Sequence, residues 1–497
     1  MTAALMIQGT GSDVGKSLIV AGLARAYTRR GLKVRPFKPQ NMSNNAAVTV
    51  EGGEIGRAQA LQARACGLEP AVDMNPLLLK PETDSGAQVI LRGRRVATLD
   101  ARRFMAEREG FLPDILESFV RLGEGADLVL VEGAGSPAEI NLRGGDIANM
   151  GFAHAAGVPV VLVGDIHRGG VIASIVGTFT VIPQADADLM SAFLINNFRG
   201  DVSLFDDGAR YLERHTARPC AGVVPHFADA RKLPAEDAVA LECAGSEGTG
   251  SVKIAVPRLA RIANFDDLDP LKLEPDVTLV MVQPGEPIPG DADLVLLPGS
   301  KSTIGDLKYL RDQGWDVDIA AHVRRGGRVL GLCGGYQMMG RMLHDPEGIE
   351  GPRESVPGLG LLDVETTLEP RKNLETVSGR HCASSAPLSG YEMHIGRTEG
   401  VDRARPFAEV RGEAEGARSA DGRAEATYLH GLFASDGFRR AYLRMLGGKG
   451  DGGLGFDDAV EAALDGLADH LEAHADLDLL LDIARRAKSR TPEPVLS

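Results

Sequence analysis

The chain has 497 residues, a formal net charge of −15 and a charged fraction of 25%. This length suggests two or three domains with large cores, and the acidic balance argues against a general nucleic-acid-binding protein, which would carry a basic face. The five cysteines are scattered and form no CxxC pair, which fits a reducing compartment. We see no leader pattern, and no apolar run approaches the roughly 20 residues that span a bilayer. We therefore expect a cytoplasmic protein that does not insert into a membrane.

The chain opens with an expected strand over residues 3–8, a glycine-rich loop and an expected helix. Strand, glycine-rich loop and helix in this order are the context of a phosphate-binding loop. Lys16 would neutralise the β and γ oxygens of a nucleotide, and the Ser17 hydroxyl can ligate magnesium. We therefore expect ATP and Mg²⁺ as cofactors and a nucleotide site made by Gly9, Thr10, Gly11, Ser12, Asp13, Val14, Gly15, Lys16 and Ser17.

An amide-rich run follows a second expected strand, residues 33–37. A surface turn is one interpretation of the run, because Asn and Ser favour turns. Four amides beside a nucleotide site also make a dense hydrogen-bonding edge, and we predict contacts with substrate or phosphate from Gln40, Asn41, Asn44 and Asn45. Residues 54–63 then predict a helix.

Three later apolar segments each end in polar residues: at Glu132, at Asp165, and at Asn196 and Asn197. They alternate with helical patterns, which is typical of a doubly wound sheet with buried parallel strands. A carboxylate at the end of such a strand, across from a phosphate-binding loop, is placed to bind magnesium, so we predict this role for Glu132 over simple capping of a turn. Asp165 and Arg168 are predicted to line the substrate cleft, with a surface ion pair as the alternative.

The second half of the chain predicts another α/β domain. Residues 244–251 have the Gly- and Ser-rich composition of a flexible linker, and several apolar strands follow it. A second glycine-rich break precedes a helical tail, which we expect to be a packing appendage. The expected domains are therefore residues 1–243, a linker over 244–251, residues 252–446, and a tail over 447–497.

A lone cysteine stands among glycines after a short apolar strand that ends at Gly331. Cys333, Gly334 and Gly335 predict a sharp strand-to-helix turn, in which small neighbours let a substrate reach the sulfur. N–H groups at the start of the next helix favour a thiolate and stabilise an oxyanion. The pattern favours a nucleophile over a structural cysteine, and His430, at the end of another strand-like run, is the candidate base.

This turn resembles the nucleophile elbow of class I glutamine amidotransferases, in the spacing Gly331-x-Cys333-x-Gly335-x-Gln337. The resemblance implies that Cys333 attacks the side-chain amide of glutamine, forms a glutamyl thioester and releases ammonia, with His430 as its partner. The family's usual His-x-Glu is missing here, because a glycine and a leucine follow the histidine. That departure is typical of the subgroup that acts on cobyrinate-type substrates, and it leaves the third triad member open.

A turn after the expected strand 293–297 matches the family element that lines the oxyanion hole. The resemblance implies that an N–H group of Gly299 or Ser300 contributes there, beside the N–H of Gly334 at the start of the elbow helix.

The long loop around Lys16 resembles the dethiobiotin synthetase branch of P-loop proteins, which use ATP to activate carboxylates. This resemblance implies that Lys38 faces the phosphates and that Asn196 or Asn197 contacts the adenine. Together with the segments 38–45, 54–60 and 75–81, nearly the whole chain resembles the CobB/CobQ family of glutamine amidotransferases. The implied fold is two doubly wound α/β domains, one P-loop NTPase-like and one amidotransferase-like, plus the helical tail.

The family resemblance implies a carbon–nitrogen ligase with two cooperating sites. ATP would activate a carboxylate as an acyl phosphate, and ammonia from glutamine would attack it. The implied substrates are glutamine and a corrinoid polycarboxylate, adenosylcobyrinic acid a,c-diamide, amidated at its b, d, e and g carboxylates in vitamin B12 biosynthesis. The sequence leaves open whether the subunits form a homo-oligomer.

Two alternatives remain at this point. One is a sister amidase that acts on the a and c carboxylates of cobyrinic acid, or a cell-wall or other amidotransferase, and the amide-rich residues 40–45 oppose it. A P-loop regulatory switch with a non-catalytic thiol domain would hydrolyse no glutamine, and the presence of both Cys333 and His430 opposes it.

Overall fold

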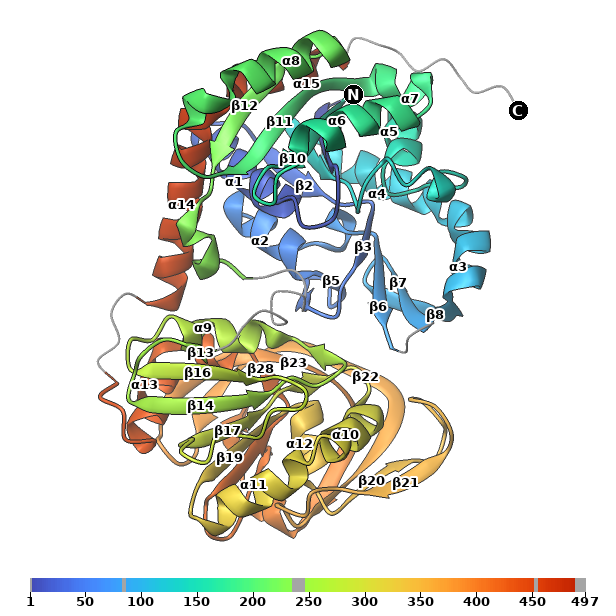
Figure 1. Ribbon diagram of the computed structural model, residues 1–497. Helices are drawn as coiled ribbons and strands as arrows, with labels where there is room; N and C mark the ends of the chain where they lie inside the picture. The colour runs from blue at the N-terminus through green and yellow to red at the C-terminus, as the bar shows by residue number, and fades with distance from the viewer. Residues whose placement is uncertain (1, 83–85, 235–245, 451–454, 488–497) are drawn as a thin grey trace.

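The computed structural model describes residues 2–82, 86–234, 246–450 and 455–487, which form two α/β domains. Figure 1 shows the first domain above the second, with the last two helices returning to the first. Among the described residues, none of the helices combines the length and the apolar character that a membrane crossing requires.

A parallel sheet of six strands organises the first domain, in the order β12-β11-β10-β1-β9-β2. Its strands are β1 (Ala3–Gly9), β2 (Val34–Phe37), β9 (Leu128–Glu132), β10 (Val160–Asp165), β11 (Met190–Phe198) and β12 (Cys220–Pro225). Strands β1 and β9 are apolar and buried along their length, as expected for a sheet covered on both faces. The carboxyl ends of the strands meet at one edge, which brings the glycine-rich loop after β1 close to Glu132.

Helices cover both faces of this sheet. Leu5 and Ile7 of β1 belong to one buried cluster, and the alternate residues Ala4 and Met6 belong to the cluster on the other face. The doubly wound architecture predicted for this half is confirmed. The helices are α1 (Lys16–Arg29), α2 (Arg57–Ala65), α3 (Ala101–Glu107), α4 (Leu112–Gly123), α5 (Met150–Ala156), α6 (Val171–Val181), α7 (Gln184–Leu189) and α8 (Asp206–Thr216), with short 3-10 turns η1 (Val72–Met74), η2 (Arg108–Phe111), η3 (Ile140–Leu142), η4 (Val202–Phe205) and η5 (Ala228–Lys232).

Two small sheets extend the first domain toward the second (Figure 1). They are the sheet of β3 (Gln40–Met42), β6 (Leu77–Pro81), β7 (Gly86–Leu91) and β8 (Arg94–Asp100), and the pair β4 (Ala46–Val48) and β5 (Glu54–Gly56). The helix predicted over residues 54–63 is therefore partly wrong. Its first three residues pair with β4 as a strand, and helix α2 begins only at Arg57.

A seven-stranded sheet forms the centre of the second domain, in the order β13-β16-β14-β17-β19-β27-β26. Its strands are β13 (Ser246–Glu247), β14 (Val252–Pro257), β16 (Val277–Val282), β17 (Leu294–Leu297), β19 (Arg328–Leu332), β26 (Ala417–Arg418) and β27 (Ala424–Thr427). The linker predicted over 244–251 lies partly outside the described residues. Its described part is not simply a loose connection, because Ser246 and Glu247 pair with β16 at the sheet edge.

A second, largely antiparallel sheet packs beside the first one in this domain. It contains β20 (Met342–Asp345), β21 (Glu354–Pro357), β22 (Val364–His381), β23 (Pro387–Gly400), β24 (Ala408–Val410), β25 (Glu413–Glu415) and β28 (Leu429–His430), and a short pair is formed by β15 (Ile262–Ala263) and β18 (Gly299–Ser300). The helices are α9 (Asp269–Lys272), α10 (Thr303–Asp312), α11 (Trp315–Arg324), α12 (Gly334–Met339) and α13 (Asp436–Met445), with 3-10 turns η7 (Phe265–Leu268), η8 (Val401–Ala404) and η9 (Leu432–Ala434).

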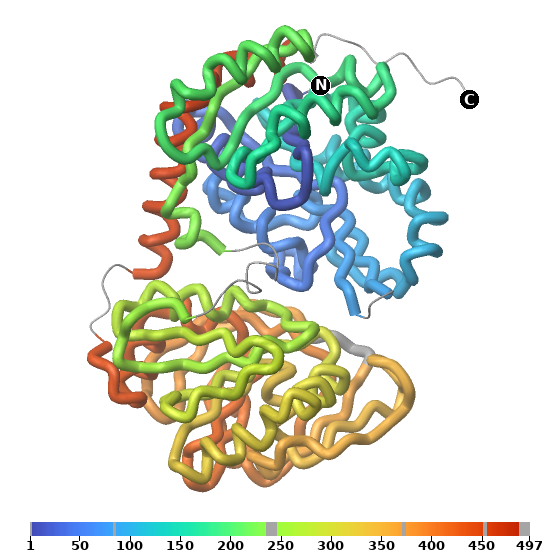
Figure 2. The backbone as a smooth tube through the Cα atoms, in the orientation of Figure 1, coloured from blue at the N-terminus to red at the C-terminus, as the bar shows by residue number. Residues whose placement is uncertain are grey.

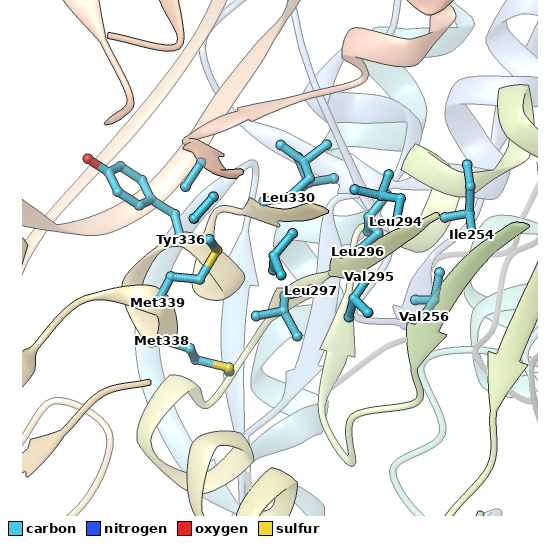
Figure 3. Close-up of a cluster of buried hydrophobic side chains, with 14 of the residues drawn as sticks. Ile254, Val256, Leu294, Val295, Leu296, Leu297, Leu330, Tyr336, Met338 and Met339 are labelled. Carbon is cyan, nitrogen blue, oxygen red and sulfur yellow. The ribbon is translucent and has the colours of Figure 1, made fainter. Parts of the chain in front are cut away.

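The core of the second domain lies directly behind the cysteine turn. Figure 3 shows Leu297 and Leu330, from the neighbouring strands β17 and β19, next to Tyr336 and Met339 of helix α12. All four side chains are at most 1% exposed. Helix α12 is therefore held against the sheet by buried apolar contacts, and the turn at its start has a rigid support.

The C-terminal helices α14 (Phe456–His474) and α15 (Leu477–Ala487) pack on the first domain, although they follow the second domain in the chain. Figure 2 shows this return of the chain beside its first helices. The predicted tail also includes residues 451–454 and 488–497, which lie outside the described part. Leu464, Leu467 and Leu471 share one buried cluster with Leu23 of α1, so these helices complete the core of the first domain.

Candidate active site

Cys333 occupies a strained turn between β19 and helix α12. Its φ of 50° is positive, which is uncommon for a residue with a side chain and typical of strain at functional sites. Glycine is required around it, because a Cβ on Gly335 would lie 2.2 Å from the carbonyl oxygen of Leu297. The turn therefore has the geometry of the predicted nucleophile elbow.

His430 faces Cys333 and is oriented by a carboxylate that the sequence did not reveal. Its Nδ1 lies 2.7 Å from Oδ2 of Asp267, and the other carboxylate oxygen of Asp267 accepts a hydrogen bond from the Gly431 N–H at 2.5 Å. This arrangement leaves Nε2 for Cys333, with which the ring is hydrogen-bonded. Asp267 comes from the 3-10 turn η7, 163 residues upstream of His430, so neither spacing nor a local motif indicated it.

The three groups favour a charged imidazolium. Burial by itself lowers the pKa of His430, but the Asp267 carboxylate and the Cys333 sulfur favour the protonated ring and raise the pKa to about 10. A protonated histidine beside a cysteine stabilises the thiolate, which is the nucleophilic form. The site therefore places a protonated imidazolium beside the cysteine at neutral pH.

The residues predicted for the oxyanion hole lie beside this pair. Gly299 and Ser300 form β18, and a Cβ on Gly299 would lie 3.0 Å from Cε1 of His430. A Cβ on Gly334 would lie 2.9 Å from the backbone nitrogen of Ser300, so the two backbone segments approach closely. The Ser300 hydroxyl donates to Asp306 at 2.6 Å, which fixes this segment.

A cavity of about 290 Å³ opens on the cysteine and is lined by both domains. The second domain contributes Cys333, His430, Gln337 and His394 among others. Burial lowers the pKa of His394 to about 4, so this ring is neutral at physiological pH. The first domain contributes charged side chains and one amide, and these are Glu54, Lys80, Arg94, Arg95 and Gln88.

The glycine-rich loop of the first domain encloses its own lysine. The Lys16 ammonium donates to the carbonyl oxygens of Gly11 and Ser12, both at 2.8 Å. Gly15 has a φ of 91°, and Asn196 donates from its side chain to the carbonyl of Val14 at 2.9 Å. Asn196 thus supports the loop, and Asn197 follows it with a φ of 60°.

Glu132 collects hydrogen bonds from several predicted site residues. Its Oε1 accepts from the Ser17 hydroxyl and from the Lys38 ammonium, both at 2.8 Å. Its Oε2 accepts from Gln62 at 2.6 Å and from Gln59 at 3.4 Å. A buried carboxylate in contact with the Ser17 hydroxyl is the oxygen-rich donor set that magnesium prefers, so these residues fit the ion.

The other predicted substrate residues form two groups, the amide-rich residues 40–45 and the pair Asp165 and Arg168. Gln40 and Asn41 belong to β3, and Asn41 donates to Gln59 at 2.8 Å. Asn44 and Asn45 follow in the same loop, and the Asn45 carbonyl accepts the N–H of Arg57.

Asp165 and Arg168 do not form the predicted alternative ion pair. Asp165 accepts the N–H of His167 at 2.7 Å, within a turn, and Arg168 is exposed. Asp165 lies beside Asn196 in the sheet register, so the turn stands next to the nucleotide loop.

Comparisons with known proteins agree with the fold of both domains. Residues 5–240 match the CobQ/CobB/MinD/ParA nucleotide binding domain, and residues 253–438 match the CobB/CobQ-like glutamine amidotransferase domain. The chain is 64% identical to a cobyric acid synthase of Cereibacter sphaeroides over 97% of this chain and 100% of the relative. It is 64% identical to that of Bradyrhizobium diazoefficiens and 60% identical to that of Methylorubrum populi, each over 98% of this chain and 100% of the relative. The chain therefore belongs to the cobyric acid synthase family of glutamine amidotransferases.

Proposed function

We propose that this protein converts adenosylcobyrinic acid a,c-diamide to adenosylcobyric acid by ATP- and glutamine-dependent amidation of the b, d, e and g carboxylates. The observation that carries the proposal is the presence in one chain of a thiol–imidazole pair and a phosphate-binding loop, in a protein that matches cobyric acid synthases along nearly its whole length. Because ATP and glutamine are cytoplasmic metabolites, we also propose a cytoplasmic location.

Ammonia would be produced at the thiol site. The Cys333 thiolate attacks the side-chain carbonyl carbon of glutamine, and N–H groups of Gly299 or Ser300 and of Gly334 stabilise the oxyanion. The His430 imidazolium gives its proton to the leaving amine, which departs as ammonia and leaves a glutamyl thioester. Water then attacks the thioester with His430 as base, releasing glutamate and regenerating the thiolate.

The carboxylate would be activated at the nucleotide loop. A carboxylate oxygen of the corrinoid attacks the γ-phosphorus of ATP, ADP leaves, and ammonia displaces phosphate from the acyl phosphate to give the amide. Lys16 and Lys38 meet the charge on the transferring phosphoryl group. Ser17 and Glu132 would hold Mg²⁺, which supplies charge neutralisation of the nucleotide phosphates.

The proposal is tested by following amidation of the corrinoid diamide with either glutamine or an ammonium salt. Cys333→Ala is expected to lose more than about 100-fold of the glutamine-driven rate and to keep the ammonia-driven rate, because only the thiol step is removed. Lys16→Ala is expected to lose both rates. Wild-type protein that amidates this diamide with neither nitrogen source would overturn the substrate, and full glutamine use by Cys333→Ala would overturn the thiol mechanism.

A further inference from the structure

One arginine of the nucleotide domain reaches into the second domain beside the thiol site. Arg57 is the first residue of helix α2, and its Nη2 makes three contacts of 2.7 Å. The partners are Oδ2 of Asp266, the hydroxyl of Tyr391 and the carbonyl of Ala46. Two of the three partners belong to the second domain, so this side chain joins the domains at one point.

The two partners in the second domain are linked to the catalytic histidine in different ways. Asp266 precedes Asp267 in turn η7, and Asp267 holds the His430 ring. Tyr391 stacks on the same ring, with centroids 5.4 Å apart and planes 22° apart, and it pairs with His430 in the sheet. Arg57 therefore contacts Tyr391, which stacks on the imidazole, and Asp266, the chain neighbour of the carboxylate that binds the imidazole.

The positive charge of Arg57 offsets the cost of burying the Asp266 carboxylate next to a second carboxylate. Asp266 and Asp267 are adjacent carboxylates, and the side chain of Asp266 is only 10% exposed. Burial raises the pKa of Asp266 to about 7 even though Arg57 opposes the shift. A buried carboxylate that loses its cation must take up a proton or move toward water, and either response disturbs the turn that carries Asp267.

The backbone of Arg57 and the helix that carries it are themselves held firmly. Two turns of helix α2 carry Gln59 and Gln62, whose side chains bond to Glu132 in the nucleotide site. Asn45 also binds the backbone N–H of Arg57 through its carbonyl at 3.0 Å. A residue that positions another group must have such a fixed support.

We propose that Arg57 is a positioning residue for glutamine hydrolysis, supplied by the nucleotide domain, which holds the Asp267–His430 pair in register through Asp266 and Tyr391. The glutamine-hydrolysing centre is then complete only when the two domains are docked. This inference rests on the roles proposed above for Cys333 and His430.

The test compares glutamine hydrolysis by full-length variants. Arg57→Gln is expected to lower kcat on the order of 10- to 100-fold through misplacement of the imidazole. KM for glutamine is expected to stay within about twofold, because Arg57 is not among the residues that line the cavity. Arg57→Lys is expected to keep kcat within about threefold of wild type, since one ammonium has three donors for the three acceptors that meet at Nη2.

A matched control and a double variant sharpen the result. Arg64 lies on the same helix and pairs instead with Asp457 and Glu461 of α14, so Arg64→Gln is expected to leave hydrolysis unchanged. Asp266→Asn removes the carboxylate that Arg57 compensates, and the double variant with Arg57→Gln is expected to hydrolyse glutamine faster than Arg57→Gln alone.

Ammonia-driven amidation by Arg57→Gln separates a local effect from misfolding, and it is expected to continue. Suppose that the wild type hydrolyses glutamine, that Cys333→Ala does not, and that Arg57→Gln has an unchanged kcat. This result would overturn the inference about Arg57 and leave the proposed function standing. Loss of hydrolysis with no gain from either the lysine or the double variant would also overturn the inference about Arg57. A wild type without hydrolysis would instead overturn the proposed function.

Discussion

At the scale of single residues, Asp267 has the strongest influence on the chemistry proposed for the thiol site. It binds the His430 ring through one oxygen and the neighbouring Gly431 N–H through the other, so it sets both the tautomer and the orientation of the imidazole. A chain that lacks the family's usual His-x-Glu can thus obtain its orienting carboxylate from a different element.

A pH profile of glutamine hydrolysis tests this role. The Asp267 carboxylate raises the pKa of His430, so Asp267→Asn is expected to lower that pKa and to move the alkaline limb of the kcat profile to lower pH. The maximum rate is expected to fall about 10- to 100-fold, since the ring loses its orientation. Asp269→Asn serves as control, because this nearby buried carboxylate pairs with Lys272 and is expected to leave the profile in place. An unmoved alkaline limb in Asp267→Asn would contradict the assignment.

At the scale of elements, the glycine-rich loop depends on a backbone conformation that only glycine adopts cheaply. Gly15 has a φ of 91°, and a Cβ there would lie 2.3 Å from Nδ2 of Asn196. Gly15→Ala is therefore expected to weaken ATP binding more than about tenfold, through strain and a shifted loop. Calorimetric titration with ATP measures the effect.

The matched control for this prediction is Gly31→Ala. Gly31 has a similar φ of 86°, but no heavy atom lies within 4 Å of the position that a Cβ would occupy. The variant shares the backbone strain without the collision, so it is expected to lose about 1 kcal/mol of stability and to bind ATP normally. Equal loss of binding in both variants would assign the effect to strain alone.

At the scale of the whole molecule, the C-terminal helices make the first domain from two separated stretches of chain. Leu471 of α14 is fully buried and packs over α1, where a Cβ on Gly22 would lie 2.5 Å from its Cδ1. Leu471→Ala is expected to destabilise the nucleotide domain by about 2–5 kcal/mol and to leave the second domain unaffected. Leu330→Ala, in the core of the second domain, is expected to do the reverse.

Calorimetric thermal unfolding, with ATP binding followed against temperature, distinguishes the two variants. Leu471→Ala should lower the temperature of the transition in which ATP binding is lost and leave the transition of the second domain in place. Glutamine hydrolysis should fall with the first transition, because the docked nucleotide domain supplies Arg57. Equal shifts of both transitions in this variant would show that the two cores unfold as one unit.

The local patterns of the sequence were sufficient for much of the fold and for one half of each proposed site. Apolar runs ending in Glu132 or in the glycines around Cys333 predicted parallel strands with functional turns, because buried strands and sharp turns need particular residue types in direct succession. The start of helix α2 was misplaced, since the pairing of residues 54–56 with a neighbouring strand overrides their helical pattern.

What the sequence determined by itself was the chemistry available: a thiol at an elbow, a histidine, a phosphate-binding loop and a carboxylate at a strand end. Only the tertiary structure decided which distant groups complete these sites. Asp267 reaches His430 across 163 residues, and Arg57 reaches Asp266 from the other domain. Such contacts arise from the packing of whole elements and leave no spacing in the chain, because residues that meet in space through different strands and turns need no fixed separation in sequence.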